Sequence, residues 1–327
     1  MAMLHHNEPQ RDTGSGCLLL NLEPKHSTAR LLAVSALLVG PSAVCAQEIE
    51  PRAFSNAPVG VNFLIVGYAF TEGGLSFDPA LPVSSPKLST SGAVAAFARS
   101  FALFGKSAKF DVVVPAASLS GSALLAGEPI ERHVDGLVDA KFRVSVNLLG
   151  GPALSLQEFK DYKPDLLVGV SLQVSAPTGQ YDNTRVVNLG TNRWWFKPEL
   201  GVSKTFGQWT LEGKAAVTVY TDNDDFYGGQ TRAQEPLYSA QGHAIYTFRP
   251  GIWGSLDATY FVGGRTTING ELNRDLQQNW RLGGTLALPI NARNSIKLNA
   301  SSGVLARTGN NFDLIAIAWQ YRWGGGL

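Results

Sequence analysis

Residues 133–149, HVDGLVDAKFRVSVNLL, alternate apolar and polar side chains over an unusually long run. One parity holds Val134, Val138, Phe142, Val144, Val146 and Leu148, and the other holds Asp135, Asp139, Lys141, Arg143, Ser145 and Asn147. Because successive side chains of a strand point to opposite faces, a period of two predicts a β-strand. Strands of soluble sheets usually end after about five or six residues, whereas an oblique bilayer crossing needs about nine to eleven. The run fits a strand between lipid and a wet interior, although one strand does not decide the question.

The same alternation recurs along the chain, at residues 164–175, 208–220 and 313–323. Each segment sets Val, Leu, Ile or aromatic side chains against polar, charged or small ones. On this template the sequence predicts twelve strands, at residues 58–70, 91–104, 108–119, 133–148, 164–176, 192–206, 208–221, 236–249, 251–263, 276–290, 294–306 and 311–323. An even number of antiparallel strands is typical of bacterial outer-membrane barrels.

The connections between these strands alternate in length. Residues 104–107, 206–208, 249–251 and 289–294 are tight turns, and residues 71–90, 120–132, 177–191, 222–235 and 264–275 are long and rich in Gly, Asn, Asp, Thr and Pro. Short periplasmic turns and long outer loops are the outer-membrane pattern. One connection, 149–164, is longer than its place predicts. We expect it to carry a brief periplasmic helix, with Leu154, Phe159 and Tyr162 packing near the barrel floor.

Composition agrees with an all-β transmembrane antiparallel barrel of about twelve strands. Only 16% of residues are charged, against about 25% in soluble domains. Aromatic residues gather at strand ends, as in the girdles that mark the headgroup level of barrels; the pairs are Tyr68 and Phe70, Phe101 and Phe104, Trp194 and Trp195, Phe206 and Trp209, Phe248 and Trp253, and Tyr321 and Trp323. A net charge of +1 gives no reason to expect a nucleic-acid partner.

The N-terminus predicts export. Lys25, His26 and Arg30 precede the apolar run at 31–40, and small residues follow up to Ala46, which is the layout of a cleaved secretory signal. We therefore expect a signal peptide at 1–46, a single barrel domain at 47–327 and a place in the bacterial outer membrane. The basic region is long, so a later start remains open, as does a lipoprotein interpretation of Cys45. Both cysteines, Cys17 and Cys45, precede the predicted cleavage site.

Several stretches also resemble a known family, the transporters associated with the phenol-degradation meta-pathway. The likeness lies in SAPTGQYDNTRVVNLGTNRWWFKPELGVSK (175–204), TDNDDFYGG (221–229), GHAIYTFRPGIWGSLDATYFVGGRTTING (242–270) and WRLGGTLALPINARNSIKLNASSGV (280–304). It covers nearly all of the mature chain. The resemblance implies an outer-membrane β-barrel that acts as a passive pore for small organic molecules, and it supplies neither catalytic residues nor a substrate.

The inward parity predicts the residues that line the lumen and limit what passes. They are Asp135, Asp139, Lys141, Arg143, Asp165, Lys197, Glu199, Glu212, Lys214, His243, Arg249, Asp257, Arg281, Lys297 and Arg322. A ring of one sign would select ions by charge, whereas mixed signs favour pairing across strands of a partly filled lumen. We expect as partners the outer-membrane lipid, a small and apolar or aromatic solute, and the insertion machinery, which would read Trp319, Tyr321 and Trp323 on the last strand.

Other functions are weighed against this one. A plugged barrel without transport is the first alternative, and an outer-membrane lipid hydrolase is a weaker one, because His133 and His243 are the only histidines of the predicted mature chain. Residues 221–225 begin like a calcium loop, but Phe226 stands where a further oxygen ligand is needed. The sequence predicts no enzyme, no metal site and no cofactor.

Overall fold

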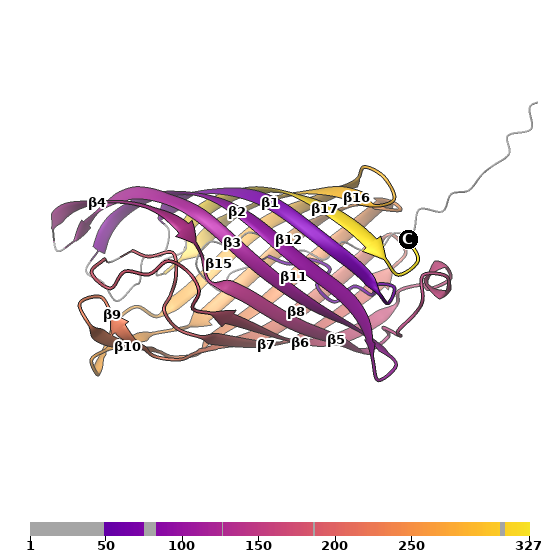
Figure 1. The fold of residues 1–327 in the computed structure, drawn as a ribbon, viewed down its shortest axis with the longest axis horizontal. Helices are drawn as coiled ribbons and strands as arrows, with labels where there is room; N and C mark the ends of the chain where they lie inside the picture. The colour runs from indigo at the N-terminus through magenta and orange to yellow at the C-terminus, as the bar shows by residue number, and fades with distance from the viewer. Residues whose placement is uncertain (1–48, 75–82, 126, 186, 308–310) are drawn as a thin grey trace, which may run out of the picture. The chain divides into compact units, whose positions relative to one another are not determined.

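Twelve antiparallel strands close into a barrel in the computed structural model (Figure 1), which describes residues 49–74, 83–125, 127–185, 187–307 and 311–327. The predicted signal peptide lies outside these residues. Strand β1 (Val61–Gly74) pairs with β2 (Val83–Leu103) on one side and with the last strand, β17 (Asn311–Gly324), on the other, which completes the ring. No helix in the described ranges is long and apolar enough to cross a membrane.

Eleven of the twelve predicted strands are confirmed, two of them longer than predicted, and the predicted strand at 133–148 is interrupted. After β2, the ring continues through β3 (Lys106–Leu125), β5 (Ala140–Leu149), β6 (Leu166–Ala176), β7 (Trp195–Phe206), β8 (Trp209–Tyr220), β11 (Leu237–Arg249), β12 (Ile252–Gly263), β15 (Gln277–Pro289) and β16 (Asn294–Ala306). Ring closure satisfies the backbone donors and acceptors that an open edge would leave in lipid.

The long run at 133–149 is two strands. Strand β4 (Glu128–Leu137) and β5 pair with different halves of the same edge of β3, and the chain breaks between them at Val138 and Asp139. A one-residue offset exchanges the two faces of a strand. In β5, which follows the break, Phe142 and Val144 are exposed, as expected for a face toward lipid, whereas Val134 in β4 and Val138 at the break are buried. The expectation that the whole apolar parity of this run faces lipid is therefore wrong for Val134 and Val138.

The connections at the loop end hold more strand than predicted. Residues 120–132, expected to be a loop, extend β3 and β4 as a hairpin. Strands β9 (Asn223–Phe226), β10 (Gln230–Gln234), β13 (Thr266–Ile268) and β14 (Glu271–Leu272) form a separate four-stranded sheet from the two loops at 222–235 and 264–275. The two loops are therefore joined to each other by backbone hydrogen bonds.

The opposite end has the tight turns and the predicted floor. A 3-10 turn, η1 (Glu158–Lys160), lies in the 149–164 connection, and Phe159 is buried in a cluster with Ala57, Val61, Phe63 and Ala98. Leu154 and Tyr162 pack against this cluster. The predicted brief helix and its packing are confirmed. By the outer-membrane convention of short turns on the inside, this end is periplasmic.

Candidate functional site

The candidate site is the interior of the barrel, which carries most of the charged residues predicted to line it. Ten of the fifteen are buried: Asp139, Lys141, Arg143, Lys197, Glu199, Lys214, His243, Asp257, Arg281 and Lys297. Glu212 and Arg322 are half-buried. The prediction that the other three line the lumen is wrong. Asp135 points outward beside His133, and Asp165 and Arg249 are exposed at strand ends.

An N-terminal segment, residues 49–60, crosses this interior and belongs to no strand. Glu50 accepts hydrogen bonds from Arg143 on β5 (2.6 Å) and from Lys214 on β8 (2.9 Å). On the β3 side, the Lys109 ammonium donates to the carbonyl oxygens of Ala53 and Ser55 at 2.7 and 3.1 Å. The segment is thus bound to several parts of the wall and obstructs the lumen.

Phe54 of this segment rests on a seat made by two glycines. Gly169 on β6 and Gly201 on β7 are register partners, and a Cβ added to either would lie 2.3 or 2.1 Å from the Phe54 ring. Only a residue without a side chain leaves room for the ring at these positions. A pair of inward glycines at matching depth was the sequence signal that could have indicated a buried aromatic group.

Charges of both signs meet around Glu50. Arg143 also binds Asp111 (3.0 Å), and Lys214 approaches Glu199 (3.4 Å), which Lys197 contacts at 3.3 Å. Three carboxylates and three cations are therefore joined in one buried network, since a buried charge is costly unless it is paired. The sequence predicted pairing across strands, but it missed Glu50 and Asp111, which complete the network.

Asp139 has a different role from its neighbours. It accepts hydrogen bonds from the backbone of Gly179 (2.9 Å) and from both the backbone and the hydroxyl of Thr191 (2.8 and 2.6 Å). These contacts tie the loop at 177–191 to the break between β4 and β5. Asp139 therefore holds the loop at 177–191 in place at the loop end of the barrel.

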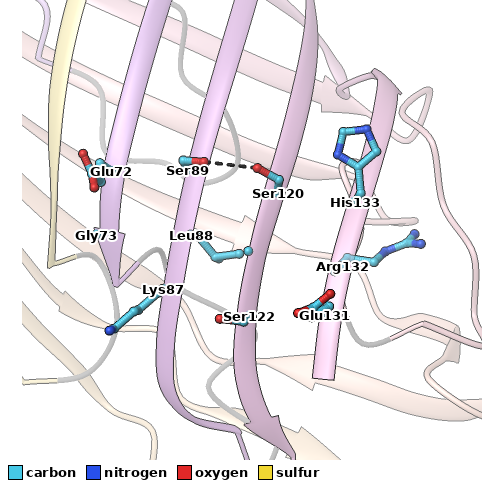
Figure 2. A pocket seen from close by; sticks show the side chains of 11 residues that line it. Glu72, Gly73, Lys87, Leu88, Ser89, Ser120, Ser122, Glu131, Arg132 and His133 are labelled. Carbon is cyan, nitrogen blue, oxygen red and sulfur yellow. Dashed lines mark hydrogen bonds between the residues drawn. The ribbon is translucent and has the colours of Figure 1, made fainter. Parts of the chain in front are cut away.

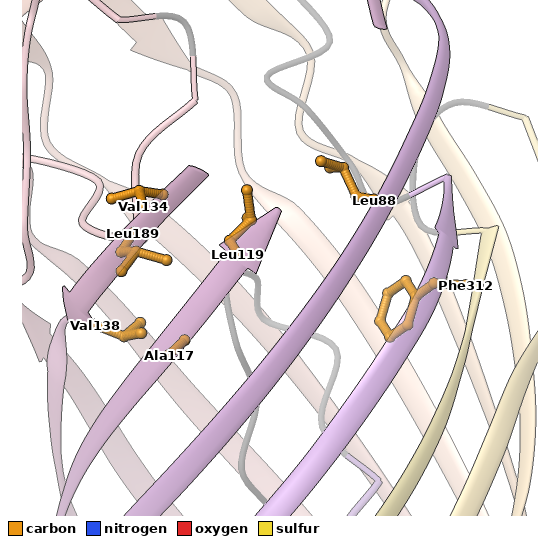
Figure 3. Packing of buried hydrophobic residues seen from close by; sticks show 7 residues of the cluster. All are labelled: Leu88, Ala117, Leu119, Val134, Val138, Leu189 and Phe312. Carbon is orange, nitrogen blue, oxygen red and sulfur yellow. The ribbon is translucent and has the colours of Figure 1, made fainter. Parts of the chain in front are cut away.

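One part of the interior at the loop end is apolar. Leu189 of that loop is buried against strands of the wall, in a cluster shown in Figure 3 with Leu88, Ala117, Leu119, Val134, Val138 and Phe312. Leu88 comes from β2 and Phe312 from β17, so the cluster spans a wide part of the ring. The described interior thus has an apolar zone at the loop end and a charged zone around the N-terminal segment.

A separate open pocket of about 1000 Å³ lies at the loop end of β1 to β4 (Figure 2). Its lining combines Glu72, Lys87, Glu131, Arg132 and His133 with short serines, of which Ser89 and Ser120 contact each other at 3.2 Å. The mixture of signs gives it no preference for a cation or an anion. Among the described residues, no group of three or more His, Cys, Asp or Glu is arranged to hold a metal ion.

His243 and Asp257 form a buried pair inside the barrel, with Nδ1 and Oδ1 2.8 Å apart. The Ser255 hydroxyl donates to Asp257 at 3.0 Å instead of approaching the histidine. His243 therefore faces the interior, and no hydroxyl of the described residues is hydrogen-bonded to its Nε2. A lipid hydrolase would need a nucleophile in contact with this base.

The predicted aromatic girdle is wrong at two positions. Trp195 and Trp253, which were predicted to belong to it, are buried in the interior. By contrast, Tyr68, Trp194, Phe206, Trp209 and Phe248 are exposed on the outer surface, together with a broad set of Leu, Val and Ile side chains. An outward apolar surface between aromatic girdles is what the hydrocarbon core of a membrane requires.

Comparisons with solved structures agree with this fold. An outer membrane channel from Pseudomonas putida F1 is similar with a TM-score of 0.72 and 20% identity, covering 84% of this chain and 100% of that one. The β-domain of the Bordetella autotransporter BrkA gives 0.47 and 10%, covering 81% and 100%. The NanC porin gives 0.44 and 8%, covering 79% and 98%. At 20% identity the likeness to the Pseudomonas putida F1 channel concerns the fold alone.

The comparison with curated protein sequences finds no significant relative. A family model, described as "Putative MetA-pathway of phenol degradation", matches residues 69–321, which is most of the barrel. The match includes the strands that carry the charged zone and ends within β17. The chain belongs to this family.

Proposed function

We propose that the protein is an outer-membrane channel for the passive uptake of small apolar or aromatic organic molecules. The observation that carries this proposal is a closed barrel whose lumen is obstructed by a segment that belongs to no strand and whose backbone–backbone hydrogen bonds to the rest of the barrel lie at its end, at Val59 and Gly60. A barrel with an apolar outer surface belongs in a bilayer. A segment that is outside the strand ladder can leave the lumen without breaking the wall.

Three further points support it. The family description refers to phenol degradation, and the similar protein from Pseudomonas putida F1 is an outer membrane channel. The buried apolar cluster around Leu189 and Phe312 lies at the loop end, where apolar solutes would enter. The charged zone below it is balanced in sign, so it does not favour ions of one charge.

The test is uptake of radiolabelled phenol by cells that express the barrel in an outer membrane rich in lipopolysaccharide. Cells with the wild-type barrel should take up phenol faster than cells with the empty vector. A variant that lacks residues 49–57 should be at least as fast and should conduct ions better in planar bilayers. Uptake equal to the vector control for both proteins would contradict a transport function.

A second candidate is a plugged barrel that has a structural role in the envelope. The Glu50 contacts and the Phe54 seat favour it, because they hold the segment firmly in the lumen. The same experiment separates the two functions. With a structural barrel, cells that express the wild type take up phenol at the rate of the vector control, whereas with a channel they take it up faster.

A further inference from the structure

Lys297 on β16 carries a buried amine that has no hydrogen-bond acceptor among the described residues. Its side chain reaches the interior and is 7% exposed. Within the described chain its Nζ has no hydrogen-bond partner, and its one recorded contact is with the Trp253 ring, 5.0 Å from the centroid. Leaving the hydrogen-bond donors of a buried amine unmade is costly. An acceptor from outside the wall would therefore be stabilised at this position.

Each of the carboxylates whose charges act on Lys297 has hydrogen-bond partners of its own. These carboxylates are Asp257, Glu50 and Glu212. Asp257 uses one oxygen for His243 and the other for Ser255 and Thr285. Glu50 binds Arg143 and Lys214, as described above. Glu212 accepts from Ser203 (3.0 Å) and from the backbone of Arg52 (2.6 Å).

A second cation shares the same indole ring. The guanidinium carbon of Arg52, in the N-terminal segment, lies 4.8 Å from the Trp253 centroid. Its Nη2 donates to the Thr247 hydroxyl at 2.9 Å. Trp253 packs on Ile245 and Ala287, so the ring is fixed between the two strands that flank β12. While the segment is in the lumen, Arg52 therefore covers the same rigid aromatic ring that Lys297 approaches.

We propose that Lys297 and Trp253 form a subsite for an aromatic anion once the N-terminal segment, and Arg52 with it, has left the indole ring: a carboxylate or phenolate oxygen then accepts hydrogen bonds from Lys297, and the aromatic ring takes the place of Arg52 against Trp253. The inference rests on the proposed function and names one class of solute for it. Charge-assisted hydrogen bonds are stronger than neutral ones, and aromatic rings attract each other in offset or edge-to-face geometry. Neutral aromatic molecules would use the ring contact alone.

The test is calorimetric titration of the full, detergent-solubilised barrel with benzoate, benzyl alcohol and acetate. Of these three compounds, benzoate should bind the wild-type barrel most tightly. Lys297→Met keeps the length of the side chain and removes its charge, so the dissociation constant for benzoate should rise about tenfold or more. Binding of benzyl alcohol should stay the same. Lys160→Met, on the exposed η1 turn, is the matched control and should bind benzoate like the wild type.

Lys297→Arg retains a cation and should restore most of the benzoate affinity. Equal affinity of the wild type for benzoate and benzyl alcohol would overturn the proposal even where Lys297→Met does not fold. Acetate that binds as tightly as benzoate would overturn the aromatic part. The titration needs no membrane, so it is independent of the uptake assay. Absence of benzoate binding together with normal phenol uptake would contradict only the subsite. Benzoate binding together with absence of uptake would contradict only the transport function.

Discussion

Glu50→Gln tests whether the N-terminal segment can leave the lumen. The substitution keeps the shape of the side chain and removes its charge, so the hydrogen bonds from Arg143 and Lys214 keep a charged donor and lose the charged acceptor. Hydrogen bonds to charged groups contribute about 1.5–3 kcal/mol each, of which we assign about 1 kcal/mol to the charge of the acceptor. Arg143 keeps Asp111, and Lys214 keeps Glu199, so neither cation is left alone. We expect the bound state of the segment to lose about 2 kcal/mol, which is about thirtyfold in population.

The assay uses a thiol placed on the segment. Cys17 and Cys45 are the only cysteines and precede the predicted cleavage site, so Ala53→Cys adds a single thiol to the processed chain. Labelling of this thiol by a membrane-impermeant maleimide reports how often the segment is accessible. Glu50→Gln should raise the labelling rate about thirtyfold, with a matching rise in ion conductance. Glu271→Gln, at the exposed β14, is the control. A labelling rate equal to that of the protein with Ala53→Cys alone would show that Glu50 does not hold the segment.

The remaining predictions concern the seat, the outer surface, the periplasmic turn and assembly. Gly201→Ala should displace Phe54 and raise conductance, because the new Cβ would lie 2.1 Å from the ring, whereas Gly213→Ala, with its nearest neighbour at 4.0 Å, should not. Val144→Arg places a charge on the lipid face and should cost about 2–4 kcal/mol of stability near the midplane; unchanged heat-modifiable gel mobility would contradict that orientation. Hydrogen bonds from the hydroxyl and backbone of Ser155 lower the pKa of Glu158. This stabilisation is present above the ordinary carboxyl pKa and is lost as pH falls through the lowered value, so Ser155→Ala should raise the Glu158 midpoint in an NMR titration. Deletion of residues 319–327 should leave the protein in the periplasm, and normal insertion would place the assembly signal elsewhere.

The sequence by itself determined the barrel. A period of two fixes which side chains face lipid, and the alternation of short and long connections orders the strands, because both depend only on neighbouring residues. The inward placement of Lys197, Lys214 and His243 follows from the same parity. The packing of Phe159 at the floor was also predictable, since the long connection had to cover the barrel end.

Only the tertiary structure decided what fills the lumen. Residues 49–60 carry no periodicity, and their position depends on contacts with strands more than 40 residues away, such as Glu50 with Arg143 and Lys214. The break at Val138 and Asp139 is likewise set by a distant loop, which binds Asp139 and reverses the facing of Asp135 and Val134. The sequence predicted that Lys297 faces inward. Its lack of a hydrogen-bond acceptor among the described residues could not be predicted, because it depends on which side chains each nearby carboxylate binds. Such pairing is a property of the closed ring, because strands that are far apart in the chain become neighbours only when the barrel closes.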